Sequence, residues 1–143
     1  AVFEDKDGFL NCFSFKGWTK EDAVLPDGIQ NGAKLVEDFG VKLVFATMGK
    51  EGCYFINRQG SGQVPTFQEV KTIDTTGAGD IFGGSAVYQV FASGVAPEQL
   101  STERLAEIVR FANAAASLST TKHGGIPSIP SKEEVEAFLS RGV

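Results

Sequence analysis

The sequence has 143 residues, 42% hydrophobic and 22% charged, enough for one globular domain with a buried core but too few for two. Its formal charge of −5, from 18 acidic and 13 basic residues, argues against a surface for nucleic acid or anionic membranes. The N-terminus lacks the apolar core of a signal peptide, and no apolar run approaches the ~20 residues of a membrane span. We therefore expect a cytoplasmic protein, in which Cys12 and Cys53 are ordinary thiols.

The first part of the chain predicts strands and one helix. Residues 9–15 alternate enough apolar side chains to form a strand. Apolar positions then recur at helical spacing over residues 29–39 and stop at a glycine, which predicts a helix with its expected C-terminal residue. Residues 42–47 and 53–57 are short β-branched and aromatic runs, which predict two strands around a turn at 48–52.

Turn and helix signals dominate the remainder. A turn at residues 58–62 closes a hairpin, and residues 63–67 and 70–73 are predicted to be extended. Helices are predicted over residues 80–93 and 101–121. A last helix is predicted from Ser131, because Glu134 follows three residues later, as a capping box requires. Strands that alternate with helices predict an α/β fold with a mainly parallel sheet and an added hairpin.

A glycine-rich segment, Asp74-Thr75-Thr76-Gly77-Ala78-Gly79-Asp80, lies where a strand is expected to give way to a helix. Two glycines around an alanine let the backbone bend sharply, so several N–H groups can face one point. The positive end of the helix dipole and the unpaired N–H groups of the first turn would stabilise a phosphate there. A carboxylate at Asp80 is short and well placed to act as a general base beside that phosphate. The segment therefore favours phosphoryl transfer.

Other interpretations of this segment are weaker. In a random sequence, Asp and Thr would simply cap a helix and Gly would make a turn, but here carboxylates at both ends and the paired threonines make the pattern more specific. A dinucleotide-binding loop is a poor alternative, because the predicted helix is followed by another helix and not by a strand ending in an acidic residue. A Walker P-loop is excluded, because no G-x-x-x-x-G-K-[ST] occurs.

Residues 74–80 resemble the C-terminal signature of the ribokinase-like (PfkB-type) carbohydrate kinases. Residues 47–52, Thr-Met-Gly-Lys-Glu-Gly, resemble the T-x-G-x-x-G segment that lies beside the ATP phosphates in that family. Residues 111–116 and 120–130 resemble its adenine-side helix and the loop that follows, in the pattern of the fructokinase branch. The resemblance runs over about residues 40–138 and implies a three-layer ribokinase-like fold, of which this chain is the C-terminal half.

The resemblance implies specific roles. Asp80 would activate the sugar hydroxyl as a base, and the N–H groups of Gly77, Ala78 and Gly79 would form the anion hole for the transferring phosphoryl group. ATP and Mg²⁺ would be the cofactors, and a small sugar would be the acceptor. The predicted contacts to the nucleotide are Thr47, Gly49, Gly52 and Asn113, although each of them taken alone could be a strand-end cap, a turn glycine or a buried amide.

Many relatives bind a monovalent cation such as K⁺ behind the anion hole, mostly through carbonyl oxygens. The matching positions are Asp74, Thr76, Ser119, Lys122, Gly124 and Ser128. His123 is predicted to be a loop residue near the nucleotide, because no set of metal-ligating partners accompanies it. The magnesium-associated N-x-x-E motif of the family is absent, and Glu21 and Asp22 lie in roughly its place.

Members of this family are about twice as long as this chain, as expected for a larger α/β domain with a small lid. We treat residues 1–143 as a single nucleotide-binding and catalytic domain, in which residues 1–28 match the family poorly. Two alternatives stay open: a truncated nucleotide-binding module without catalysis, and a kinase of nucleosides or sugar phosphates. The missing half would leave a sheet edge and apolar faces exposed, so a second chain or copy is a possible partner.

Overall fold

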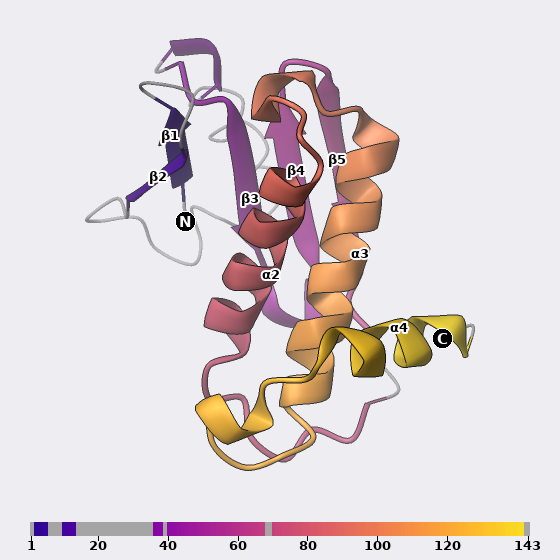
Figure 1. Cartoon of the computed structure of the whole chain (residues 1–143). Coiled ribbons are helices and arrows are strands. Elements are labelled where there is room, and N and C mark those ends of the chain that lie inside the picture. The colour runs from indigo at the N-terminus through magenta and orange to yellow at the C-terminus, as the bar shows by residue number, and fades with distance from the viewer. Residues whose placement is uncertain (1, 6–9, 14–35, 39, 68–69, 142–143) are drawn as a thin grey trace.

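The computed structural model describes residues 2–5, 10–13, 36–38, 40–67 and 70–141. Its described strands form one sheet in the order β2-β1-β3-β4-β5 (Figure 1). These strands are β1 Val2–Asp5, β2 Leu10–Phe13, β3 Leu43–Thr47, β4 Cys53–Asn57 and β5 Gly60–Val64.

Every pair of neighbouring strands in the described sheet is antiparallel, so the expectation of a mainly parallel sheet is wrong for this part of the chain. The connections explain why β3, β4 and β5 run this way. Residues 48–52 join β3 to β4, and Arg58 and Gln59 join β4 to β5. Links of that length reverse the chain, whereas parallel neighbours need a crossover of about a dozen residues or more.

The hairpin of β4 and β5 is tighter than the sequence predicts, because β5 begins at Gly60, inside the expected turn at 58–62. Phe55 pairs with Gly62 across the two strands. A Cβ atom at Gly62 would lie 2.5 Å from Cζ of Phe55, so the glycine leaves room for the aromatic ring. Residues 70–73, which were expected to be extended, belong to no strand.

The helices agree with the sequence to within two residues at most of their ends. They are α2 Ala78–Ala92, α3 Thr102–Ser119 and α4 Lys132–Ser140, with short 3₁₀ turns η1 Gly49–Glu51, η2 Pro97–Gln99 and η3 Ile126–Ser128. Ser131 caps α4, as predicted, by accepting a hydrogen bond from the Glu134 N–H at 3.1 Å. The helix predicted over residues 29–39 is described only at Val36, Glu37 and Asp38, where the chain is helical.

The core lies between the sheet and the α2–α3 pair, which covers one of its faces (Figure 1). Phe45 of β3 meets Phe82 of α2 edge to face, with ring centroids 6.3 Å apart. Asn57 is buried at the end of β4, and its Nδ2 donates to the carbonyls of Pro97 and Leu100 at 3.0 and 2.8 Å. This amide fastens the hairpin to the segment that joins α2 to α3.

Of the two cysteines, the structure describes the side chain of Cys53. Cys53 is fully buried in the core, and burial raises the pKa of its thiol, so it stays protonated and behaves as an ordinary thiol. The side chain of Cys12 lies outside the described residues.

In the described ranges, no helix combines the length and the apolar character that crossing a membrane would require.

Candidate active site

The glycine-rich segment forms the entry to α2, as the sequence predicts. Gly77 precedes the helix in the left-handed conformation, with φ of 77°, and no side chain caps the helix start. Because an L-residue is strained at that φ, the chain bends here at the least cost with glycine. The N–H of Ala78 donates to the Thr75 carbonyl at 3.2 Å, whereas helix geometry leaves the N–H groups of Gly79 and Asp80 without an intrahelical acceptor.

Asp80 is the third residue of α2 and its side chain is exposed. A carboxylate in the first turn of a helix is stabilised by the positive end of the helix dipole. Its solvent-facing position leaves it accessible to a substrate hydroxyl. Asp80 and Gly77 lie outside the lining of the neighbouring cavity, whereas Ala78 and Gly79 belong to it.

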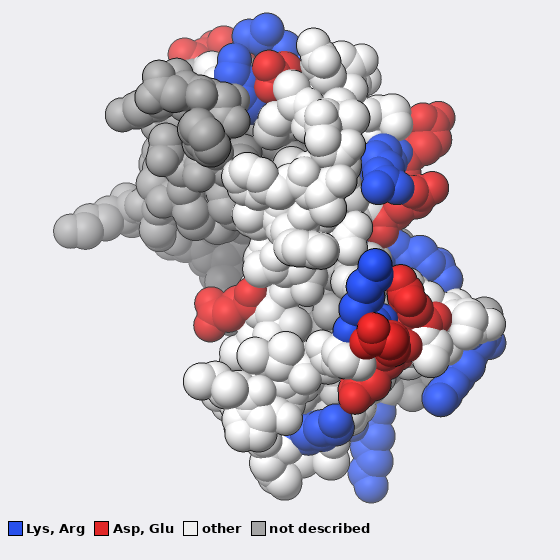
Figure 2. Space-filling model, viewed as in Figure 1, with Lys and Arg blue, Asp and Glu red and all other residues white. Residues whose placement is uncertain are grey.

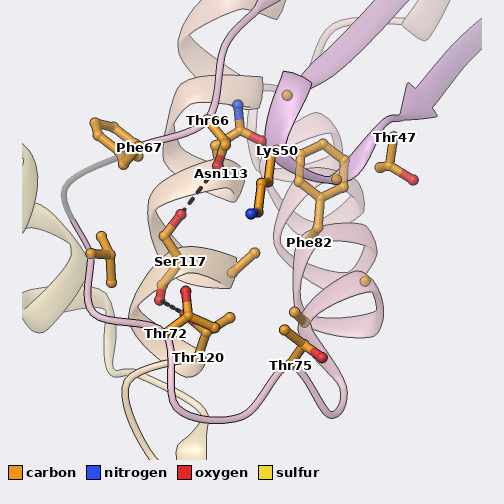
Figure 3. A pocket seen from close by; sticks show the side chains of 16 residues that line it. Thr47, Lys50, Thr66, Phe67, Thr72, Thr75, Phe82, Asn113, Ser117 and Thr120 are labelled. Atoms are coloured by element: carbon orange, nitrogen blue, oxygen red, sulfur yellow. Dashed lines mark hydrogen bonds between the residues drawn. The ribbon is translucent and has the colours of Figure 1, made fainter. Parts of the chain in front are cut away.

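A cavity of about 320 Å³ opens beside this helix start (Figure 3). It lies between the end of β3, the segment after β5, the first turn of α2 and the inner side of α3. All four residues predicted to contact the nucleotide line it: Thr47, Gly49, Gly52 and Asn113. The remaining lining residues are Lys50, Thr66, Phe67, Val70, Thr72, Thr75, Phe82, Ala116, Ser117 and Thr120.

Two of the predicted nucleotide contacts, Gly52 and Asn113, also have a role in the fold itself. Gly52 has a φ of 92°, and a Cβ atom there would lie 2.0 Å from the Val64 carbonyl oxygen, so no other residue fits. Asn113 is buried, and its Nδ2 lies 3.2 Å from the Val64 carbonyl and 3.3 Å from the Pro65 carbonyl. Its amide therefore holds the end of β5 against α3.

Lys50, which was not among the predicted site residues, points its amine into the cavity in Figure 3. Its position in the glycine-flanked turn η1 could have identified it, since lysine is a common point-charge ligand for phosphate. Hydroxyl groups such as those of Thr66 and Ser117, which are 3.2 Å apart, were missed as well. Nothing in their local sequence distinguishes them from ordinary polar residues.

Phe67 lies at one side of the cavity and packs against α3 and α4. The Phe67 ring packs edge to face on Phe138 of α4, with centroids 5.0 Å apart. The guanidinium carbon of Arg110 lies 5.5 Å from the centre of the same ring. The Phe67 ring therefore belongs to the contact of this segment with α3 and α4, at the edge of the cavity.

The residues predicted for a cation are partly brought together around Asp74. One carboxylate oxygen of Asp74 accepts hydrogen bonds from the hydroxyl and N–H of Thr76 at 2.6 and 2.9 Å, and the other accepts from the Gly124 N–H at 2.9 Å. These bonds, led by the Thr76 hydroxyl, lower the pKa of Asp74 to about 2. The carboxylate therefore stays ionised and joins the loop before α2 to the loop after α3.

The other predicted cation residues lie around the end of α3. The hydroxyl of buried Ser119 donates to the Ala116 carbonyl at 2.6 Å, and that of buried Ser128 donates to the Gly125 carbonyl at the same distance. The Lys122 amine lies 3.8 Å from Glu134 of α4, so its side chain points to α4. His123 is an exposed loop residue, and the described part of the chain holds no cluster of three His, Cys, Asp or Glu for a metal.

Comparison with known proteins identifies the family. Residues 9–132 match the pfkB family carbohydrate kinases. Fructokinase-1 from Zea mays is 42% identical over 102 residues, which cover 71% of this chain and 30% of that protein. The chain thus spans less than a third of this relative's length.

Two solved structures agree with the resemblance that the motifs indicated. Ribokinase from Thermotoga maritima superposes with a TM-score of 0.63 at 39% identity, over 78% of this chain and 34% of that one. Fructokinase from Vibrio cholerae, solved with fructose, ADP and a calcium ion, gives a TM-score of 0.62 at 31% identity, over 78% of this chain and 35% of that one. The expected ribokinase-like fold is confirmed, and the chain belongs to the pfkB family of carbohydrate kinases.

Proposed function

We propose that this chain is the nucleotide-binding and catalytic part of an ATP-dependent sugar kinase, with fructose or a related ketose as acceptor, and that it works in the cytoplasm. The observation that carries the proposal is the cavity at the start of α2, where the T-x-G-x-x-G turn, Asn113 and the glycine-rich loop meet. The Lys50 amine, which points into this cavity, suits the phosphates.

In the proposed reaction, Asp80 takes the proton from a sugar hydroxyl as that oxygen attacks the γ-phosphorus of ATP. The bond from this phosphorus to the bridging oxygen of ADP breaks, ADP leaves, and the proton on Asp80 passes to water. The N–H groups at the start of α2 stabilise the charge on the moving phosphoryl group. Because the Ala78 N–H already donates to Thr75, Gly79 and Asp80 are the readier donors.

Two ions accompany this proposal. Mg²⁺ bound to ATP would neutralise phosphate charge, with phosphate oxygens and water among its ligands. The oxygens around Asp74 fit K⁺, since the carboxylate is ionised and the hydroxyls of Ser119 and Ser128 donate elsewhere and keep lone pairs. We assign this cation to Asp74, Thr76 and the turn that follows α3.

The test is ADP release from Mg-ATP with K⁺ present, using fructose and a panel of other sugars, sugar phosphates and nucleosides. The Asp80→Asn substitution should lower acceptor-dependent release about 10²-fold or more. Glu103→Gln is the matched control, because Glu103 is an exposed acid in the first turn of α3, and it should leave the rate unchanged. Equal rates for the unmodified chain and Asp80→Asn would overturn the catalytic assignment.

A second candidate is a nucleotide-binding module without catalysis of its own, favoured by the position of Asp80 outside the lining of the cavity that the predicted nucleotide contacts share. ATP binding measured by calorimetry, without acceptor-dependent ADP release, would support it. Release with a nucleoside and not with a sugar would instead identify a nucleoside kinase of the same family.

A further inference from the structure

Lys50 gives the cavity beside α2 its charge. Among the described residues that line this cavity, Lys50 is the one with a charged side chain, and the others are apolar residues, glycines, hydroxyl residues and Asn113. Figure 3 shows the Lys50 amine directed into the cavity from the turn η1. The chain as a whole has a formal charge of −5, so an anion meets favourable charge only locally. The charged side chain that this cavity offers to an anion is therefore Lys50.

The backbone of the turn that carries Lys50 is largely bonded within the turn itself. The N–H of Met48 donates to the Gly52 carbonyl at 2.8 Å, and the N–H of Gly52 donates to the Gly49 carbonyl at 3.2 Å. The Glu51 N–H donates to the Met48 carbonyl at 3.1 Å. Gly49 and Gly52 have φ of 54° and 92°, values that favour glycine, and so allow this tight turn. The main group that the turn can offer to an anion is therefore the lysine side chain.

We propose that Lys50 is a specificity-determining residue, whose amine binds the phosphate chain of the nucleotide and so distinguishes a nucleotide from its uncharged nucleoside. The glycine-rich side of the cavity binds anions differently, because helix geometry leaves the Gly79 N–H without an intrahelical acceptor. The two sides together give a phosphate chain backbone donors from α2 and a charged amine from η1. The inference rests on the proposed function, and it adds the residue that selects the phosphoryl donor. Figure 2 shows that few other charged side chains lie over α2 on the face that it displays.

The phosphate that Lys50 meets belongs to the nucleotide and not to a phosphorylated acceptor. All four residues predicted to contact the nucleotide line the same cavity as Lys50. Asp80, the proposed base, lies outside that lining. Because the acceptor hydroxyl must reach Asp80 for the proton to be removed, the acceptor binds beyond this cavity. A phosphate inside the cavity is therefore part of the donor.

The expected contribution of the amine is moderate. Lys50 is exposed, and water weakens the attraction between exposed charges. A nucleotide that fills the cavity displaces part of that water, and charge-assisted hydrogen bonds to phosphate are stronger than neutral ones. We therefore expect the amine to raise nucleotide affinity about 10-fold.

The test is calorimetric binding of ATP, ADP and adenosine to the chain, with Mg²⁺ present. Lys50→Gln should weaken ATP and ADP about 10-fold and change the Kd of adenosine by less than about twofold, because adenosine has no phosphate. Lys50→Arg keeps the charge and should restore most of the nucleotide affinity. Lys71→Gln is the matched control, because Lys71 is an exposed lysine outside the lining of the cavity, and it should leave all three affinities unchanged.

The outcomes separate this inference from the proposed function. Equal weakening of adenosine and ADP by Lys50→Gln would overturn the inference, because Lys50 would then support the shape of the cavity, and so would an unchanged ATP affinity. Weaker binding of fructose 6-phosphate with unchanged ADP would also overturn it, because Lys50 would then contact the acceptor. The expected binding pattern without acceptor-dependent ADP release would refute the proposed catalysis alone. A chain that binds no ATP would overturn both.

Discussion

Helices α2 and α3 lie side by side on the same face of the sheet, but their N-terminal caps and their exposed sides differ (Figure 1). The start of α3 is closed by the Ser101 hydroxyl, which accepts the Arg104 N–H at 3.2 Å, and its outer side carries charges that include Arg104 and Glu107. The start of α2 has only Gly77 and no side-chain cap, and its outer side is apolar. Helix α3 is therefore capped by a side chain and polar toward water, whereas α2 has no side-chain cap and exposes apolar side chains.

The largest expected effect is a difference in unfolding free energy between substitutions on the two sides of α2. Phe82→Ala should lower the free energy of unfolding by about 3–5 kcal/mol, because it removes a buried ring packed on Phe45 and leaves a cavity. Tyr88→Ala, on the exposed side of the same helix, should change it by no more than about 0.5 kcal/mol. Urea denaturation of both variants measures the difference, and similar losses would mean that the side of α2 that carries Tyr88 is already packed.

The next effect concerns the bend before α2. Gly77→Ala should cost about 1–2 kcal/mol of unfolding free energy, because φ is 77° there and the new Cβ would lie 3.4 Å from the Gly125 Cα. Gly79→Ala is the matched change two residues on, within the helix and with open space around it, and should stabilise the chain by about 0.4–1 kcal/mol. Chemical denaturation of both variants checks the sign, and a loss at Gly79 would show that its backbone is also strained.

A smaller effect is expected at the closed start of α3. Ser101→Ala should cost about 1 kcal/mol, because the Arg104 N–H loses its acceptor. Ser131→Ala at the start of α4 removes the equivalent bond to Glu134 and should cost a similar amount. Thermal denaturation would show both losses, and no change at either position would mean that water replaces the caps without cost.

The last prediction depends on pH. The folded chain holds the pKa of Asp74 at about 2, below the ordinary value of 3.8, so the ionised carboxylate favours the folded state. That contribution is complete above about pH 4 and is lost as pH falls toward 2. The stability difference between the unmodified chain and Asp74→Asn should therefore shrink over this window. Urea denaturation at several pH values measures it, and a difference that persists at pH 2 would exclude this carboxylate as the cause.

Much of the fold could be predicted because its signals are local. Ser131 and Glu134 identified the start of α4, and the β-branched and aromatic runs identified β3 and β4. The short links predicted at residues 48–52 and 58–62 already imply antiparallel neighbours, as the structure has them, whereas the alternation of strands with helices misleadingly predicts a mainly parallel sheet. The glycines of the 58–62 segment suggested a turn, but the Phe55 ring needs one of them within β5, a requirement that only tertiary contact creates.

In the candidate site, too, some residues could be predicted from local sequence and others could not. The glycine-rich loop could be predicted because its glycines and the helix that follows them can both be recognised in the sequence. The structure places this loop beside the cavity. Lys50, Thr66 and Ser117 were missed, because their role depends on distant segments that meet only in the folded chain. The catalytic and nucleotide-binding assignments stay predictions until the substitutions above are measured.

The antiparallel arrangement of α2 and α3 limits how far the site can attract an anion. The Thr120 carbonyl at the end of α3 accepts the N–H groups of Ile73 and Asp74 at 2.7 and 3.0 Å, so the negative end of α3 lies close to the positive end of α2. At long range the two helix fields oppose each other and, with a net charge of −5, the chain does not draw anions from solution. A phosphate is stabilised here only at hydrogen-bonding distance, which favours a ligand that other contacts have already brought into place.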